Sequence, residues 1–318
     1  MKRRFLAPAL LLNLFAAAGV VRAQGAEVHV LPVQGNIYML VGTGGNTTVQ
    51  IGKDGVLVVD PQQAAMSSKV IAAIRQLSDQ PIRYLINTQF REDHTGGNAN
   101  VAKAGERLVP TGGAGGLGQV IGQTADSAQI FAHLNVLARM TKQGVPSEYW
   151  PTDTFATPKK ELFINNEAIQ IIHEPAAHTD GDTIIFFRRS DVISTGDVFI
   201  KTGYPVIDIE NGGSINGIID ALNQIIDLAI PQEKQEGGTM VIPGHGRLCD
   251  EADVVEYRDM LTIIRDRIQD MIRKGMTAQQ VEAARPTLDY DPLYGSDSGP
   301  WTTKMFVGAV YRSLSKKQ

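Results

Sequence analysis

A polar loop that follows a short apolar strand constrains this chain more than any other feature. The strand is Ile82–Ile86, and the loop reads Asn87-Thr88-Gln89-Phe90-Arg91-Glu92-Asp93-His94-Thr95-Gly96-Gly97-Asn98. The loop brings a carboxylate and an imidazole side by side, and both groups are common ligands of zinc. An Asp-His pair is frequent in proteins, so its meaning depends on what the rest of the chain supplies.

Three later segments supply matching groups. They are Ala177-His178-Thr179-Asp180-Gly181-Asp182, Thr195-Gly196-Asp197 and Pro243-Gly244-His245-Gly246. In this order, the four segments resemble those of the metallo-β-lactamase-fold superfamily, whose first loop normally reads His-x-His-x-Asp-His. Here Gln89 and Arg91 stand where that loop has its first two histidines.

The resemblance implies a four-layer αββα sandwich, in which two mixed sheets face each other and helices cover both outer faces. Strand and helix patterns alone predict an α/β or α+β protein with two sheets. The predicted strands are 28–33, Ile37–Val41, 47–51, Val56–Val59, Ile82–Ile86, 162–164, 168–173, 183–187, 192–195 and Met240–Ile242. The predicted helices are Ser67–Leu77, 128–140, Ile215–Leu228 with Ser214 as its N-cap, 251–274, and a short helix begun by a capping box at Thr277.

Residue by residue, the resemblance implies one complete metal position, which we call the intact position. Its ligands are Asp93, His94 and His245, and Asp197 matches a bridging carboxylate. Nitrogen and carboxylate oxygen ligands suit zinc. Iron and manganese are alternatives, because carboxylate-rich sites accept several metals.

The other metal position, here called the altered position, keeps only one of its three histidines, His178. Gln89 offers an amide oxygen, a weak ligand at best, and Arg91 offers none, because a guanidinium stays protonated and has no lone pair to donate. Its charge would repel a dication by several kcal/mol even at an effective dielectric of about 20. We therefore predict that this position binds no zinc, and that Arg91 pairs with Asp197 or Glu92.

These residues favour a zinc-dependent hydrolase with a single metal ion, acting on a small-molecule ester, amide, lactam or phosphoester. Asp93 would bind the metal, and Asp197 would be a further ligand or a proton acceptor. Arg91 would hold an anionic group or an oxyanion, and His178 would act as general acid or base. The alternative is a catalytically impaired binding protein that holds an anionic ligand on Arg91. Serine hydrolysis has little support, because segment 212–217 is not a G-x-S-x-G elbow.

Several other residues are predicted to be structural. Asp60 is expected to brace the metal loop, and Cys249 to be a partly buried thiol, although its place four residues after His245 leaves a ligand role open. His29, His133 and His173 are interpreted as structural histidines. A G-x-G-x-x-G match in segment 111–118 lacks the helix start and acidic residue of a dinucleotide site, so a flexible loop is favoured. Loops 111–122 and 201–213 are expected to select the substrate.

The beginning of the chain resembles a signal peptide. Lys2, Arg3 and Arg4 precede an apolar run, and Val21-Arg22-Ala23 offers a cleavage site, so residues 1–23 are predicted to be removed and the protein to be periplasmic or secreted. Removal deletes four positive charges and changes the net charge from −4 to −8. Such an acidic chain is not expected to bind nucleic acid, and no stable membrane anchor remains. Residues 24–318 are predicted to form one domain with a helical C-terminal extension from about residue 251.

Overall fold

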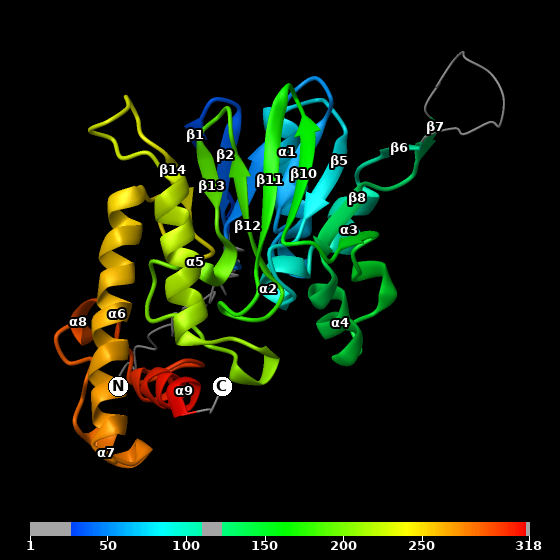
Figure 1. Cartoon of the computed structure of the whole chain (residues 1–318). Helices are drawn as coiled ribbons and strands as arrows, with labels where there is room; N and C mark the ends of the chain where they lie inside the picture. The colour runs from blue at the N-terminus through cyan, green and yellow to red at the C-terminus, as the bar shows by residue number, and fades with distance from the viewer. Residues whose placement is uncertain (1–26, 110–122, 316–318) are drawn as a thin grey trace, which may run out of the picture.

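The computed structural model describes residues 27–109 and 123–315, and the larger of its two main sheets has seven strands (Figure 1). Their order across the sheet is β1-β2-β3-β4-β5-β8-β9. The first four strands pair antiparallel, and β4, β5, β8 and β9 run parallel to one another. The strands are β1 (His29–Gln34), β2 (Ile37–Val41), β3 (Thr47–Gln50), β4 (Val56–Val59), β5 (Ile82–Ile86), β8 (Gln129–His133) and β9 (Asp153–Phe155).

The second main sheet has five strands in the order β10-β11-β12-β13-β14. It is also mixed, because β13 and β14 are parallel whereas the other neighbours are antiparallel. Its strands are β10 (Lys159–Ile164), β11 (Glu167–Glu174), β12 (Asp182–Phe187), β13 (Val192–Ser194) and β14 (Met240–Ile242). A separate hairpin is formed by β6 (Arg107–Val109) and β7 (Gln123–Ala125).

Helices occupy both outer faces of the sandwich and the C-terminal part of the chain. The α-helices are α1 (Ser67–Leu77), α2 (Glu92–Thr95), α3 (Asn98–Lys103), α4 (Leu134–Lys142), α5 (Ile215–Leu228), α6 (Glu251–Arg273), α7 (Ala278–Ala283), α8 (Asp291–Tyr294) and α9 (Thr303–Ser315). Single 3₁₀ turns are η1 (Ala64–Met66), η2 (Ser147–Tyr149), η3 (Gly196–Val198) and η4 (Ile209–Asn211).

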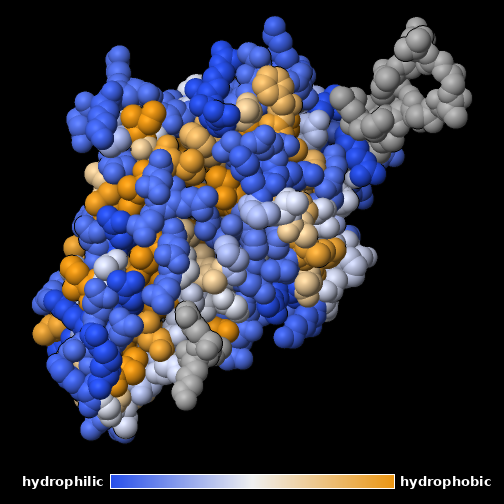
Figure 2. Space-filling view, in the orientation of Figure 1, coloured by the Kyte–Doolittle hydropathy of each residue, from blue (hydrophilic) through white to orange (hydrophobic). Residues whose placement is uncertain are grey.

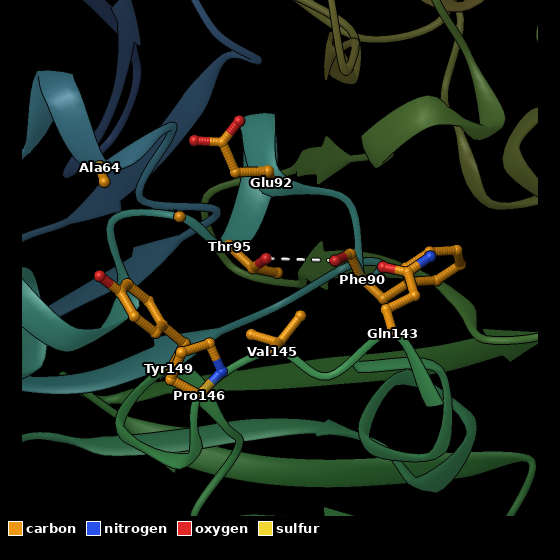
Figure 3. A pocket seen from close by; sticks show the side chains of 9 residues that line it. Ala64, Phe90, Glu92, Thr95, Gln143, Val145, Pro146 and Tyr149 are labelled. Atoms are coloured by element: carbon orange, nitrogen blue, oxygen red, sulfur yellow. Dashed lines mark hydrogen bonds between the residues drawn. The ribbon is translucent and has the colours of Figure 1, made fainter. Parts of the chain in front are cut away.

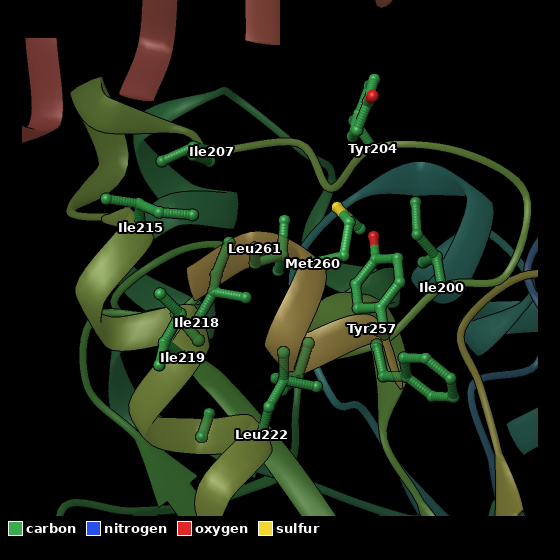
Figure 4. Close-up of a cluster of buried hydrophobic side chains, with 14 of the residues drawn as sticks. Ile200, Tyr204, Ile207, Ile215, Ile218, Ile219, Leu222, Tyr257, Met260 and Leu261 are labelled. Carbon is green, nitrogen blue, oxygen red and sulfur yellow. The ribbon is translucent and has the colours of Figure 1, made fainter. Parts of the chain in front are cut away.

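Three groups of buried apolar side chains separate the layers. One lies between the two sheets and joins residues such as Ile86 and Phe131 to Ile171 and Ile185. A second joins the outer face of the larger sheet to α1 and α3. The third joins the outer face of the smaller sheet to α5, α6 and α9, and Figure 4 shows side chains of α5 and α6 meeting within it. This is the predicted αββα order of layers.

The structure corrects one predicted helix. Segment 128–140 was expected to be helical throughout, but Gln129–His133 is β8, which pairs with β5 and β9 inside the sheet, and α4 begins only at Leu134. His133 is the N-cap, and its Nδ1 accepts a hydrogen bond from the Asn135 backbone N–H. The strand passes into the helix without a Gly or Pro between them, so the apolar residues of both looked like one helical stripe.

The ends of most other elements fall within two or three residues of their predictions. The helices Ser67–Leu77 and Ile215–Leu228 have the predicted bounds, and Ser214 caps the latter by accepting from the Gly217 N–H. The capping box at Thr277 is also present. The predicted signal peptide and the 111–122 loop lie outside the described residues.

No helix within residues 27–109 and 123–315 combines the length and apolar character needed to cross a bilayer. On the face shown in Figure 2, hydrophobic residues at the surface are interspersed with hydrophilic ones along α5 and α6.

Candidate metal centre

Three loops bring the four predicted ligands of the intact position to one edge of the sandwich. The one-turn helix α2 follows β5 and carries Asp93 and His94. Asp197 lies in η3, directly after β13, and His245 follows β14. Because β13 and β14 are parallel neighbours, the loops after them emerge at the same end of the sheet. In Figure 1, α2 lies at this edge, between α5 and α4.

The ligand atoms have the spacing of one coordination sphere. His245 Nε2 lies 3.2 Å from Asp93 Oδ2 and 3.4 Å from Asp197 Oδ1. His94 Nε2 lies 3.3 Å from Asp197 Oδ1 and 3.9 Å from Asp93 Oδ2. Ligands placed tetrahedrally around zinc at their usual bond lengths are about 3.4 Å apart. Asp93, His94 and His245 are also the one group of the described residues whose ligand atoms all lie within 4.8 Å of one another.

Two buried atoms of this group lack a hydrogen-bond partner, and both face the same point. They are His94 Nε2 and Asp197 Oδ1. His94 Nδ1 lies 2.8 Å from Asp60 Oδ2, so Asp60 accepts the ring proton and leaves the Nε2 lone pair free. Buried polar atoms are rarely left unpaired, and a metal ion would satisfy both. The residues present therefore fit a metal ion.

Asp60 is the brace that the sequence predicted. Its side chain is 2% exposed and accepts hydrogen bonds from the Thr88 N–H (2.8 Å) and the Thr88 hydroxyl (2.5 Å) in addition to His94. Its backbone is left-handed, with φ of 54°. A carboxylate behind a metal-binding histidine fixes the ring orientation and the tautomer.

The electrostatics of the centre favour a positive charge at this point. Burial opposes ionisation of Asp197, but the charges of His94 and His245 outweigh it and hold the pKa of Asp197 well below its usual range. Burial likewise opposes ionisation of Asp93, while the hydrogen bond to His245 and the charge of His94 lower its pKa. In the buried His94, Asp197 and Asp60 raise the pKa well above its usual value in spite of burial.

Two glycines leave room for these side chains. A Cβ on Gly45 would lie 2.8 Å from His94 Cε1 and 2.9 Å from Nε2, and a Cβ on Gly244 would lie 2.4 Å from Asp197 Oδ1. Both contacts are shorter than real Cβ atoms show. Any larger residue at either position would displace a ligand, so the sequence makes space here by omitting side chains.

The altered position differs from the prediction in how its side chains pair. The hydrogen bond to Asp197 comes from Gln89, whose Nε2 donates to Oδ2 over 2.7 Å, and not from Arg91. Gln89 Oε1 accepts from the Arg91 backbone N–H (3.0 Å), so its oxygen is committed. The expected pairing of Arg91 with Asp197 or Glu92 is therefore wrong. Gln89 is fully buried, whereas Arg91 is partly exposed.

The guanidinium of Arg91 lies beside the surviving histidine instead. Arg91 Nη1 is 3.5 Å from His178 Nε2, and His178 Nδ1 is 3.4 Å from Asp182 Oδ1. Burial disfavours a charged imidazole, but Asp182 and Asp197 outweigh it and raise the pKa of His178. Asp182 belongs to the sequence motif around His178, but no role was predicted for it. Its position four residues after His178 was the available signal.

A second acid lies behind Asp182 at the end of β11. Glu174 is the strand partner of Asp182 and is 5% exposed, and its Oε1 has no hydrogen-bond partner. Burial, aided by the negative charges of Asp182 and Asp220, raises the pKa of Glu174 to about 8. Sequence analysis assigned nothing to this residue, because a single Glu at a strand end carries no recognisable pattern.

The remaining candidates lie outside the metal group. Cys249 is buried, pairs with Val241 in a β-bridge, and has its pKa raised to about 12 by burial. His133 and His173 stack on each other with ring centroids 3.5 Å apart, and His173 Nε2 bonds the Asp180 carbonyl oxygen. His29 is exposed on β1.

Comparisons with known proteins place this geometry in a fold. No family model matches the chain. A linear primary-alkylsulfatase from Pseudomonas sp. is 23% identical over 259 residues, which are 72% of this chain and 47% of the relative. The structure of the inverting sec-alkylsulfatase Pisa1 from Pseudomonas sp. matches with a TM-score of 0.63 and 12% identity over 90% of this chain and 50% of that one. This chain thus spans about half the length of both alkylsulfatases.

Metallo-β-lactamases match over a smaller part of this chain but over nearly all of their own. The enzyme from Pontibacter korlensis has a TM-score of 0.55 and 13% identity over 74% of this chain and 99% of its own. The DIM-1 metallo-β-lactamase has a TM-score of 0.53 and 14% identity over 74% and 97%. The chain therefore has the metallo-β-lactamase fold. The fold implied by the sequence motifs is confirmed.

Proposed function

We propose that this protein is a metal-dependent hydrolase that holds a single ion, most suitably zinc, at the intact position. The observation that carries the proposal is the convergence of His94 Nε2 and Asp197 Oδ1, both unpaired and buried, with Asp93 and His245 at distances of 3.2–3.9 Å. A zinc ion bound there would lower the pKa of a coordinated water towards 7 and polarise an ester or amide oxygen.

The residues of the altered position are assigned to the substrate. The Arg91 side chain is partly exposed, whereas Gln89 and His178 are fully buried, so Arg91 is the group that a ligand meets. A guanidinium binds sulfate, phosphate and carboxylate through paired N–H donors. A leaving group held there would also lie close to the His178 ring, whose protonated form is favoured by Asp182 and Asp197 and would be the proton donor. Asp182 orients the ring from its other side.

The substrate proposed is a small-molecule ester that carries an anionic group. Sulfate esters are the first to test, because both alkylsulfatases resemble this chain. β-Lactams, lactones, thioesters and phosphodiesters follow, since the same fold is found in β-lactamases. The proposal covers the whole protein's activity although the chain spans only about half of each alkylsulfatase.

Metal content and turnover test the proposal together. The full chain, purified and given excess zinc, is expected to retain about one equivalent by elemental analysis and to hydrolyse at least one substrate of the panel. His245→Ala should lose both, whereas His29→Ala, a control on the exposed face of β1, should lose neither. A wild-type protein that retains no metal and cleaves nothing would overturn the proposal and favour the binding-protein alternative.

A further inference from the structure

A pocket of about 270 Å³ lies directly behind the metal loop. Its walls come from η1, from the loop and helix that carry the ligands, and from the connection between α4 and η2. Figure 3 shows Val145 between Tyr149 and Phe90, with Thr95 facing them and Glu92 at the far edge. Nothing assigned so far to the metal centre uses this pocket.

The pocket and the metal centre are the two sides of one stretch of backbone. Gln89, Arg91 and Asp93 belong to the metal centre, and the intervening Phe90 and Glu92 line the pocket. Neighbouring Cα atoms are only about 3.8 Å apart. Arg91 is partly exposed and Glu92 is exposed, so a ligand can pass over the loop at this point and occupy both.

The lining selects an uncharged apolar group. The apolar side chains in the lining include those of Phe90, Val145 and Pro146, and Tyr149 adds an aromatic ring. The Thr95 hydroxyl already donates to the carbonyl oxygens of Phe90 (3.2 Å) and Arg91 (3.0 Å), so it offers no free donor. A carboxylate at the edge, from Glu92, disfavours an anionic group by repulsion.

The volume limits the size of that group. An apolar cavity of about 150 Å³ accepts benzene, whereas complete small-molecule sites usually exceed about 300 Å³. A pocket of about 270 Å³ therefore holds one substituent and not a whole substrate.

We propose that this pocket binds an aryl or short alkyl substituent of the substrate, while the anionic group of the same molecule lies on Arg91. The inference rests on the proposed hydrolase function, and it adds a size limit to the substrate. A linear chain longer than the pocket accommodates gains nothing more from it.

Two variants and a matched control test the pocket. Val145→Trp fills it from the middle, and Gln143→Trp covers it from an exposed position, where folding is least disturbed. Leu134→Trp adds the same bulk at a site that is 45% exposed on α4, outside the pocket. None of these residues belongs to the metal centre.

The first measurement is the binding of para-fluorotoluene, followed by fluorine NMR, because it requires no turnover. The wild type and Leu134→Trp should broaden and shift its signal, and Val145→Trp and Gln143→Trp should weaken binding by at least about tenfold. Absence of binding to the wild type, or equal binding by all four proteins, would overturn the pocket assignment whatever the activity.

The second measurement is the hydrolysis of linear alkyl sulfates from ethyl to octyl by the zinc-loaded proteins. In the wild type, kcat/KM should rise roughly fourfold per methylene until the chain fills the pocket and then level off, and both pocket variants should remove the rise. If no sulfate is cleaved but para-fluorotoluene binds in the pocket, the proposed hydrolysis of sulfates fails and the apolar site remains. If sulfates are cleaved with the same chain-length profile in every variant, the hydrolase stands and the pocket proposal fails.

Discussion

The intact and the altered position lie at the same edge of the sandwich, but their side chains are paired in different ways. In the intact position, carboxylates surround histidines, and two buried atoms are left unpaired. In the altered position, Gln89 donates to Asp197, and Arg91 Nη1 lies 3.5 Å from His178 Nε2. The altered position already contains the permanent positive charge of Arg91, whereas the intact position has no such cation. The hydrogen bond from Gln89 therefore keeps Asp197 Oδ2 paired without an ion in the altered position.

The comparison breaks most visibly if the altered position is given back its histidines. Gln89→His together with Arg91→His removes the repelling charge, worth several kcal/mol at an effective dielectric of about 20, and adds two ligands beside His178. Bound zinc is expected to rise from one to two equivalents, measured by elemental analysis after gel filtration. Arg91→Ala alone is the control and should stay near one. A double variant that still holds at most one ion would show that these residues do not mark a lost metal position.

The intact position can be broken at His245, a ligand that is partly exposed. The His245 side chain is 28% exposed, so its removal disturbs packing little. His245→Ala should lower zinc affinity by more than about 100-fold, beyond the 10- to 100-fold loss typical of groups behind the ligands. Competition with a chromophoric chelator measures the change. An affinity within tenfold of the wild type would exclude His245 from the ligand set.

The sequence predicted these two halves unequally. Asp93, His94, Asp197 and His245 could be predicted to lie together because the motifs that hold them resemble, in the same order, those of the metallo-β-lactamase-fold superfamily. The pairing within the altered position could not be predicted, since a choice between Gln89 and Arg91 as the partner of Asp197 depends on side-chain reach and burial. Motif order carries no such information.

The fold was predictable where periodicity was uninterrupted, and failed where one pattern ran into another. The α5 stripe of Ile218, Leu222 and Ile225 has a capped start and gave the correct bounds. Ile130 and Ala132 are buried residues of strand β8, and Val136 is a buried residue of helix α4. No turn signal separates the two elements. Only the pairing with β5 and β9 identifies Gln129–His133 as a strand, and these partners are distant in sequence.

Glu174 lies behind Asp182, in the altered half of the centre, and it makes the stability of the protein depend on pH. The pKa of Glu174 is raised to about 8 from an ordinary value of 4.5, so the folded protein prefers the protonated form. Its stabilising contribution is complete below pH 4.5 and is lost as the pH rises towards 8. Glu174→Gln removes this dependence and is expected to stabilise the protein by about 2–4 kcal/mol above pH 8.

Urea unfolding of both proteins at pH 5 and pH 9, without added metal, measures the effect of Glu174→Gln. The difference in unfolding free energy should be small at pH 5 and should favour the variant at pH 9. An unchanged pH dependence in the variant would mean that Glu174 is ionised in the folded state at neutral pH, and that its pKa is not raised by burial.

The smallest expected effect compares Asp60 with Asp182, each of which lies behind one histidine. Asp60→Asn keeps the shape of the side chain and tolerates the left-handed backbone, but it weakens the acceptor that fixes His94. Zinc affinity should fall by about 10- to 100-fold. Asp182→Asn should leave affinity within about threefold, because His178 holds no ion, and should act instead on substrate turnover through the His178 ring. Chelator competition on both variants decides the matter: an equal loss from the two substitutions would place metal on His178 and would mean that the altered position is not closed to ions.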